Sequence, residues 1–338
     1  MKIFLDDSQC REKLFPFTHT RHVADIRIGI LTIREKWQLL TGKTIENFTG
    51  NRSDNDFIIN ANTLPTPDDH KSIIEGKSND FKILEFPWQI FQYNDWAIRE
   101  DFKLLRKERN SEPISDTNTV IGDQIFIEKG AVVEHSILNS STGPIYIGKN
   151  AVIMEGNLIR GPFAICEGAT LKMGSKVYGA TTLGPYCVAG GEIKNSVMFG
   201  FSNKAHDGYL GDSVLGEWCN LGAGTSNSNV KNTGGEVKYT IADDAQNIAA
   251  GNKAGLLMGD YSRAAINTSF NTGTVVGVCC NIFGEYMPEK YIANFTWGGE
   301  RYDLEKALKD IGNWKKMKGR SVSEAEIQIL QQLYKTTK

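Results

Sequence analysis

A polar stretch across residues 190 to 235 holds the residue types that proton transfer and phosphate binding require. Its one histidine is His206, and a neutral imidazole can accept a proton from an attacking amine or hydroxyl near physiological pH. Lys194 and Lys204 could place positive charge beside a phosphate. Amide groups that can hydrogen bond to sugar hydroxyls follow at Asn220 and Asn229. The stretch therefore predicts a polar site, and a structural histidine with asparagines stacked at corners is the alternative.

A six-residue repeat of apolar residues surrounds this stretch. Its clearest members are Ile147, Ile153, Ile159, Ile165, Leu171, Val177 and Leu183. Earlier members are Ile121, Ile127 and Val133, and later ones are Leu215, Leu221, Met258, Ala264, Phe270, Val276 and Ile282. This period is typical of parallel β-helices, in which three hexapeptides, about 18 residues, close one coil. The repeat predicts a mainly β protein with a β-helix over most of residues 114 to 284, whose phase slips in the polar stretch.

Glycine commonly follows the repeated apolar residue. The pattern occurs at Ile121-Gly122, Ile147-Gly148, Leu183-Gly184, Leu221-Gly222 and Val276-Gly277. Because glycine has no Cβ, it adopts backbone conformations that strain other residues. We therefore expect these glycines to form tight corners.

The regions on either side of the repeat lack the six-residue period. Residues 1–110 alternate apolar clusters with polar loops, which predicts a small α/β domain with helices at 28–40 and 94–107. Residues 288–338 predict two helices, the second capped by Ser323 with Glu324 or Glu326. We expect this tail to cover unpaired strand edges at the end of the β-helix, which itself occupies residues 111–287.

Composition narrows the classes of partner. A net charge of −2 and a mean hydropathy of −0.32 give no reason to expect nucleic acid or membrane as a partner. The apolar stretch at residues 1–5 is too short for a signal peptide, so we expect a cytoplasmic protein. Six cysteines without Cys-x-x-Cys spacing predict free buried thiols. A zinc site of three histidines is disfavoured because the repeat contains only His135 and His206.

Several strings in the repeat carry a family resemblance. They are Gly191-Glu192-Ile193-Lys194-Asn195-Ser196, Lys204-Ala205-His206, Tyr209-Leu210-Gly211-Asp212, Asn220-Leu221-Gly222-Ala223-Gly224-Thr225 and Asn229. Together they closely resemble the acetyltransferase half of bifunctional N-acetylglucosamine-1-phosphate uridyltransferases and their archaeal sugar-1-phosphate nucleotidyltransferase relatives. This resemblance spans about residues 114 to 284. It implies a left-handed parallel β-helix, a homotrimer, and acetyl-CoA and a sugar phosphate as small-molecule partners.

The resemblance also implies roles for single residues. His206 would deprotonate the amine of glucosamine 1-phosphate, and Asn220 would orient the acceptor or the histidine. Lys194 and Tyr209 would hold the sugar phosphate, and Asn229 would contact the sugar. The acetyl-CoA site would be lined by Ala223 with Gly222 and Gly224, and by the coil with Ile266-Asn267-Thr268-Ser269 and Gly273. By analogy with other acyl transfers, backbone N–H groups of the turn at residues 222–225 would hold the oxyanion.

Two details depart from the family pattern. Relatives usually place arginines after the Gly161-Pro162-Phe163-Ala164 string, whereas this chain continues with Ile165-Cys166-Glu167. The spacing from Lys204 to His206 is one residue shorter than the family's loop. The missing arginines imply a different acceptor. The shorter spacing from Lys204 to His206 affects the orientation of the imidazole.

The N-terminal region resembles a divergent branch of sugar nucleotidyltransferases. The strings are Asp6-Asp7, Leu14-Phe15-Pro16-Phe17-Thr18, Thr20-Arg21, Ala24-Asp25-Ile26-Arg27-Ile28-Gly29-Ile30 and Phe86-Pro87-Trp88. The region lacks the glycine-rich phosphate loop and is about half the usual length. If it is active, Asp6, Asp7 and Asp25 are the candidate Mg²⁺ ligands.

The sequence with its family resemblance favours an acetyl-CoA-dependent acyltransferase. One alternative is a sugar-1-phosphate nucleotidyltransferase whose β-helix only assembles a trimer, and another is a sugar-nucleotide sensor or scaffold without turnover.

Overall fold

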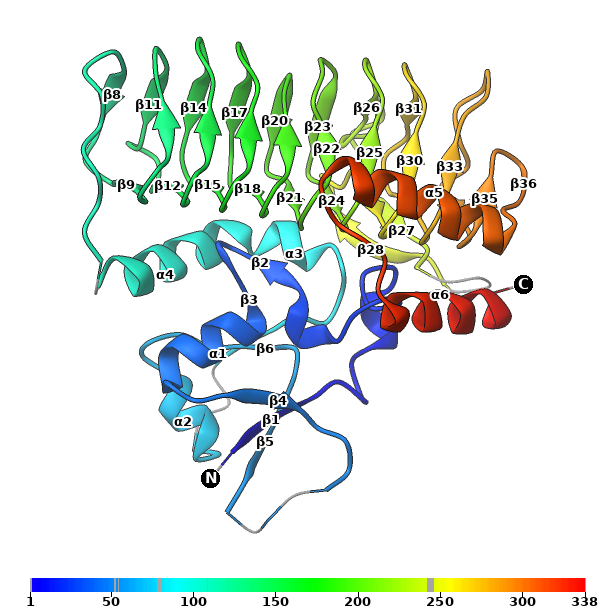
Figure 1. Ribbon diagram of the computed structural model, residues 1–338, viewed down its shortest axis with the longest axis horizontal. Coiled ribbons are helices and arrows are strands. Elements are labelled where there is room, and N and C mark those ends of the chain that lie inside the picture. The colour runs from blue at the N-terminus through cyan, green and yellow to red at the C-terminus, as the bar shows by residue number, and fades with distance from the viewer. Residues whose placement is uncertain are drawn as a thin grey trace.

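A parallel β-solenoid forms one side of the molecule, and the N-terminal region packs against one of its faces (Figure 1). The computed structural model describes residues 2–51, 53, 55–77, 81–107, 109–241 and 246–337. The mainly β fold class predicted from the hexapeptide repeat is confirmed.

Three stacks of parallel strands make up the solenoid. The docked face consists of β9 (Ile125–Ile127), β12 (Ile145–Ile147), β15 (Phe163–Ile165), β18 (Thr181–Leu183), β21 (Val197–Met198), β24 (Val214–Leu215), β29 (Leu256–Met258), β32 (Thr274–Val276) and β34 (Tyr291–Ile292). The lateral face consists of β10 (Val132–Val133), β13 (Val152–Ile153), β16 (Thr170–Leu171), β19 (Val188–Ala189), β22 (Asn203–Lys204), β25 (Asn220–Leu221), β30 (Arg263–Ala264), β33 (Asn281–Ile282) and β35 (Thr296–Trp297). The open face consists of β8 (Thr119–Ile121), β11 (Ile137–Asn139), β14 (Leu158–Arg160), β17 (Lys176–Tyr178), β20 (Glu192–Lys194) and β23 (Tyr209–Gly211), and β26 (Ser226–Asn227) pairs with β31 (Ser269–Phe270) farther along.

The repeated apolar residues fill the interior of the solenoid. The seven members of the clearest run are at most 2% exposed. Ile147 pairs with Ile165, and Ile153 pairs with Leu171, so one coil takes eighteen residues. One member was assigned wrongly: Val120, not Ile121, is the residue of β8 in register with the inward-facing Leu138, although both Val120 (42%) and Ile121 (44%) are exposed in this coil.

Gly122 has the left-handed φ of 86° expected of a tight corner, but the other glycines after the repeated residue do not. Gly148 and Gly184 are examples without a left-handed backbone. A Cβ on Gly148 would lie 2.8 Å from the carbonyl carbon of Cys166, and one on Gly184 would lie 1.2 Å from the Phe199 oxygen. These glycines are therefore required because the next coil passes too close for any side chain.

The phase slip in the polar stretch corresponds to coils of unequal length. Ala189 pairs with Lys204, only fifteen residues later, and Met198 pairs with Leu215, seventeen residues later. The following coil takes forty-three residues, from Leu215 to Met258, because the chain leaves the solenoid. The excursion carries an antiparallel hairpin of β27 (Val237–Tyr239) and β28 (Ile248–Gly251).

The N-terminal region is built around a small parallel sheet. In it, β1 (Ile3–Asp6) lies between β4 (Ile45–Asn47) and β5 (Phe57–Asn60). The other elements are η1 (Glu12–Leu14), η2 (Val23–Asp25), β2 (Arg27–Ile28), β3 (Leu31–Thr32), β6 (Thr63–Leu64), β7 (Lys82–Ile83), α1 (Ile33–Thr41), α2 (His70–Ile74), α3 (Gln89–Gln92) and α4 (Asn94–Arg106). The helix expected at 94–107 is confirmed as α4. The helix expected at 28–40 begins only at Ile33, because Gly29 forms a left-handed turn and Thr32 caps the helix together with Glu35.

A continuous hydrophobic core joins this region to the docked face. Trp88 stacks on Tyr239 of the excursion, with ring centroids 5.3 Å apart, and Phe17 lies 5.3 Å from Phe199. Arg21 forms a buried ion pair with Asp260 of the solenoid. The N-terminal region and the solenoid therefore bury each other's apolar surface.

The C-terminal tail forms two helices, α5 (Leu304–Met317) and α6 (Glu324–Thr336). Ser323 and Glu326 form the capping box of α6, as expected. The helices pack on corner residues of several coils, including Trp218, Tyr261 and Phe295. The tail therefore covers the side of these coils, while the antiparallel strand β36 (Glu300–Arg301) borders the terminal edge of the lateral sheet.

All six cysteines are buried free thiols, as the sequence predicted. Among the described residues, no helix has both the length and the apolar character needed to cross a bilayer.

Candidate functional site

His206 lies on the corner between the lateral and open faces. Its loop follows β22 and precedes β23, and the imidazole is exposed. The carbonyl oxygen of Asp207 accepts a hydrogen bond from the Gly224 N–H at 3.0 Å, and that of Gly208 accepts one from Glu192 at 3.3 Å. The backbone of the loop is thus held by the coils on both sides, while no described residue hydrogen bonds to the imidazole itself.

The three residues expected to bind the sugar phosphate gather on the open face. Lys194 lies on β20 and Tyr209 on the neighbouring strand β23. Asn229 follows β26 on the next coil, and its side-chain N–H donates to the Tyr209 hydroxyl at 3.1 Å. These side chains, all half-buried, form a polar patch beside the His206 loop.

Asp212 organises this patch, a role that was not expected from the sequence. Its buried carboxylate accepts hydrogen bonds from the side chains of Asn195, at 2.7 Å, and Asn229. Burial, and then the negative charge of Asp212, raise the pKa of the Tyr209 hydroxyl. The phenol therefore stays protonated and can donate a hydrogen bond. Asp212 ends the Tyr209-Leu210-Gly211-Asp212 string, so the resemblance already contained the signal that could have identified it.

Lys194 has an aromatic neighbour and no ion pair among the described residues. Its ammonium lies 5.8 Å from the centroid of the Tyr178 ring. Tyr178 donates a hydrogen bond to Glu192 at 2.6 Å, and this bond is the main reason that the pKa of Tyr178 rises to about 12. The charge of Lys194 is therefore available to an anionic ligand.

Lys204 does not offer its charge to a phosphate, contrary to the first interpretation of the sequence. The side chain is 2% exposed and points into the solenoid, and its ammonium donates to the carbonyl oxygens of Gly190, at 3.0 Å, and His206. Burial lowers the pKa of this ammonium to about 8. Lys204 is therefore an internal support of the loop.

Asn220 lies on the lateral face, away from the open-face patch. Its side-chain oxygen is 3.4 Å from the amide of Asn203, whose own oxygen accepts a hydrogen bond from Lys318 at 3.0 Å. No hydrogen bond joins Asn220 to His206 in the part of the chain that the structure describes. Neither Asn220 nor Asn229 adopts the left-handed backbone that corner asparagines would use, whereas Asn195 does, with φ of 46°.

The residues expected to line the acetyl-CoA site form the corner between β25 and β26, one coil after the corner that carries His206. The Ala223 carbonyl oxygen accepts a hydrogen bond from Asn267 at 2.7 Å. The N–H groups of Gly222, Gly224 and Thr225 already donate to Ala264, Asp207 and Gly222 respectively. In the described turn only the Ala223 N–H lacks a backbone acceptor, so the expectation that the whole turn holds an oxyanion was too broad.

A cavity adjoins this corner. It has a volume of about 240 Å³ and is lined by Asn267, Thr268 and Ser269 together with residues 282–288. The neighbouring Ile266 is 68% exposed and Tyr286 is 89% exposed. The coil of residues 266–269 therefore combines polar groups with uncovered apolar surface.

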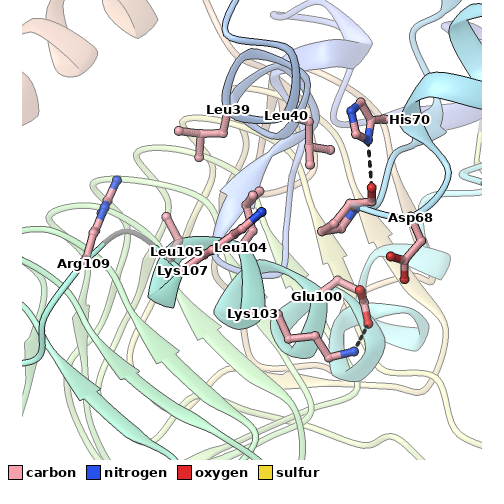
Figure 2. A pocket seen from close by; sticks show the side chains of 11 residues that line it. Leu39, Leu40, Asp68, His70, Glu100, Lys103, Leu104, Leu105, Lys107 and Arg109 are labelled. Atoms are coloured by element: carbon pink, nitrogen blue, oxygen red, sulfur yellow. Dashed lines mark hydrogen bonds and ion pairs between the residues drawn. The ribbon is translucent and has the colours of Figure 1, made fainter.

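A second cavity, of about 420 Å³, lies between α1 and α4 (Figure 2). Figure 2 shows Lys103 paired with Glu100. The Nδ1 atom of His70 lies 3.1 Å from the carbonyl oxygen of Pro67. None of the residues singled out from the sequence lines this cavity.

The acidic residues of the N-terminal region are already engaged. Asp7 pairs with Arg11 at 2.8 Å, and Asp25 binds Arg34 through both oxygens at 2.6 and 3.0 Å. Asp6 accepts a hydrogen bond from the Ser8 N–H at 2.9 Å. Within the described residues, no cluster of three histidine, cysteine, aspartate or glutamate side chains could hold a metal ion. The three carboxylates in this arrangement do not fit a magnesium site.

Parts of the chain are similar to proteins described as bifunctional. A family model described as sugar nucleotidyl transferase matches residues 2–52. The bifunctional protein GlmU of Methanocaldococcus jannaschii is 29% identical over 221 residues, which make up 64% of this chain and 47% of that protein. The expected resemblance is confirmed.

Other bifunctional relatives cover similar or shorter parts of the chain. The bifunctional sugar-1-phosphate nucleotidylyltransferase/acetyltransferase of Sulfurisphaera tokodaii is 28% identical over 62% of this chain and 48% of that protein. GlmU of Synechococcus elongatus is 31% identical over 33% of this chain and 26% of that protein. The chain thus spans about half the length of the first two relatives.

Proposed function

We propose that the solenoid is a CoA-dependent acyltransferase, which transfers acetyl from acetyl-CoA to the amine of a sugar phosphate such as glucosamine 1-phosphate. The supporting observation is the position of His206, which is exposed three residues before Tyr209 and beside the patch with Lys194 and Asn229. The relative from Sulfurisphaera tokodaii is described as an acetyltransferase as well as a nucleotidylyltransferase. Proton acceptor, phosphate-binding charge and sugar-binding amide thus adjoin one edge of the solenoid.

In the proposed reaction, the neutral acceptor amine attacks the thioester carbonyl, and His206 takes the proton that the nitrogen loses as the C–N bond forms. The C–S bond breaks as the tetrahedral intermediate collapses. The departing sulfur of CoA then takes the proton from His206. The Ala223 N–H is the donor we assign to the oxyanion, and no acyl-enzyme forms.

The acceptor phosphate would rely on Lys194 rather than on arginines. The Ile165-Cys166-Glu167 string replaces the family's arginines, and Cys166 packs beneath the N-terminal region, with its sulfur 3.6 Å from the Ile30 carbonyl oxygen. A side chain at that position could not reach a sugar on the open face. We therefore propose that this enzyme holds the acceptor phosphate with fewer cations than its relatives use.

Assembly, compartment and domain division follow as proposals. Outward-facing Ile137 and Leu158 on the open face are 39% and 47% exposed, which suits contact between copies in a cytoplasmic homotrimer. Residues 1–110, 111–287 and 288–338 would be a nucleotidyltransferase-like region, the acyltransferase and a helical tail. A monomeric mass in solution would contradict the trimer.

The substitution His206→Ala tests the assigned base. Removing a general base typically costs about 10²–10⁴-fold in rate, so kcat for acetyl-CoA consumption with hexosamine 1-phosphates should fall by that factor. His135→Asn is the matched control, because His135 is the other histidine of the solenoid, is exposed, and has a left-handed φ of 50° that asparagine tolerates. Equal kcat in His206→Ala and the parent would refute the assignment.

Nucleotidyl transfer by the N-terminal region is the second candidate, favoured by the family model that matches residues 2–52. Pyrophosphate release from a nucleoside triphosphate, a sugar 1-phosphate and Mg²⁺ should be assayed in parallel. Release without any acetyl transfer would favour this candidate. Binding of a sugar nucleotide without turnover in either assay would favour the sensor.

A further inference from the structure

A lysine lies inside the solenoid at the corner that carries His206. The inward-facing row of the lateral face runs through Ile153, Leu171 and Ala189, and the next member in register is Lys204. The first three belong to the hydrophobic core, and Lys204 is among the largest side chains that are almost completely buried. Burying a charged group in this row costs desolvation free energy, so we expect the Lys204 ammonium to make hydrogen bonds that offset the cost.

The corner beneath His206 explains what the ammonium does. The coil that ends at Lys204 takes fifteen residues instead of eighteen, and it turns through Gly190 and Gly191. Gly191 has a φ of 74°, and a Cβ there would lie 2.8 Å from the His206 carbonyl oxygen. The two coils thus approach closely at the shortened corner, with the carbonyl oxygens of Gly190 and His206 near one ammonium.

The Lys204 ammonium is the hydrogen-bond donor that these oxygens share. It donates to Gly190 at 3.0 Å and to His206, on successive coils. A buried carbonyl without a donor costs free energy, so the loop would rearrange if the ammonium were lost. Burial lowers the pKa of the Lys204 ammonium to about 8. This value still lies above neutral pH, so the group is mostly protonated there.

We infer that Lys204 is the positioning residue of the proposed general base, holding the His206 backbone against the Gly190 corner from within the solenoid. This inference rests on the proposed function. The imidazole has no hydrogen bond of its own to a described residue, so its aim depends on the backbone that carries it. A displacement of the base by about 1 Å can cost about 10²-fold in rate.

Two substitutions separate hydrogen bonding from packing. Lys204→Met keeps an unbranched chain of similar volume but removes all donors, whereas Lys204→Gln keeps two N–H donors on a shorter side chain. Leu171→Met, in the same inward row on an earlier coil, is the packing control. Rates, hydrogen exchange and thermal unfolding should be measured on the full chain.

Lys204→Met should lower kcat about 10²-fold and leave the KM for acetyl-CoA within about threefold, because the loop moves but the cofactor corner does not. Hydrogen exchange should speed up in peptides covering residues 203–210, and the Tm should stay near that of the parent. Lys204→Gln should recover part of both kcat and protection, while Leu171→Met should change neither.

Hydrogen exchange also separates this inference from the proposed function. If the parent transfers no acetyl group, the proposed function fails. Faster hydrogen exchange of the 203–210 loop in Lys204→Met would still show that Lys204 holds this loop in place. Unchanged exchange and kcat in Lys204→Met would overturn the inference. So would an equal loss in Lys204→Gln with no recovery of either property.

Discussion

At the scale of single residues, the role of a side chain in this protein depends on its surroundings as well as on its type. Lys194 and Lys204 looked equivalent as sources of positive charge, but one lies beside an aromatic ring on the open face and the other lies in the core. Successive side chains along a strand point alternately into and out of the solenoid, and this alternation decides the difference. A one-residue shift of register would turn an outward-facing lysine inward and an inward-facing lysine outward. The sequence could rank both as candidates but could not separate them.

His19 provides a pH-dependent test at this scale. The ring stacks on Phe15, and burial, followed by repulsion from Arg11, lowers its pKa to about 4. The unfolded chain therefore binds a proton at higher pH than the folded chain, so stability is complete above pH 6.5 and is lost as pH falls toward 4. The loss should reach about 3 kcal/mol at most.

Urea unfolding at pH 7 and pH 4.5 checks this expectation. His19→Gln should show a smaller loss of stability between the two pH values than the parent, and His135→Asn should behave like the parent. An identical loss in His19→Gln and the parent would show that other groups cause the acid sensitivity.

At the scale of elements, the spacing between coils controls where glycine is needed. Gly184 is enclosed by the backbone of the next coil, whereas at Gly200 the nearest atom to an added Cβ is 3.5 Å away. Neither has a left-handed backbone. The sequence pattern located the first kind of glycine correctly, but the cause is contact between coils, which no single hexapeptide reveals.

The pair Gly184→Ala and Gly200→Ala tests this cause. Gly184→Ala should reduce the free energy of unfolding by about 3 kcal/mol or more, because the coils must separate. Gly200→Ala should stay within about 1 kcal/mol of the parent. Both can be measured by chemical denaturation, and comparable values for the two variants would contradict the argument.

At the scale of the whole molecule, motifs that resemble a nucleotidyltransferase also join the N-terminal region to the solenoid. Thr20 and Arg21 both bind Asp260, and Arg21 is 3.4 Å from Glu217. Gly29 and Asn94 form a second junction, in which the Asn94 side chain bridges the Gly29 N–H and the Ala180 carbonyl oxygen. The two parts should therefore unfold together.

Arg21→Met tests the first junction. Removing one partner of a buried ion pair leaves the carboxylate of Asp260 uncompensated, and the expected loss is about 3–5 kcal/mol in the free energy of unfolding. Arg11→Met, which removes a half-exposed pair with Asp7, should cost about 1 kcal/mol or less. A single unfolding transition that shifts only in Arg21→Met is expected, and two separate transitions in the parent would contradict the shared core.

The hexapeptide period alone determined the solenoid, because inward-facing apolar residues must recur once per side of every coil. The motif strings likewise located His206, Lys194, Tyr209 and Asn229 near one edge. Only the tertiary structure decided that Lys204 points inward, that Asn220 contacts Asn203 on the lateral face, and that Asp212 organises the patch. These outcomes depend on coil length, on an excursion of the chain and on packing between distant segments, which local spacing does not encode.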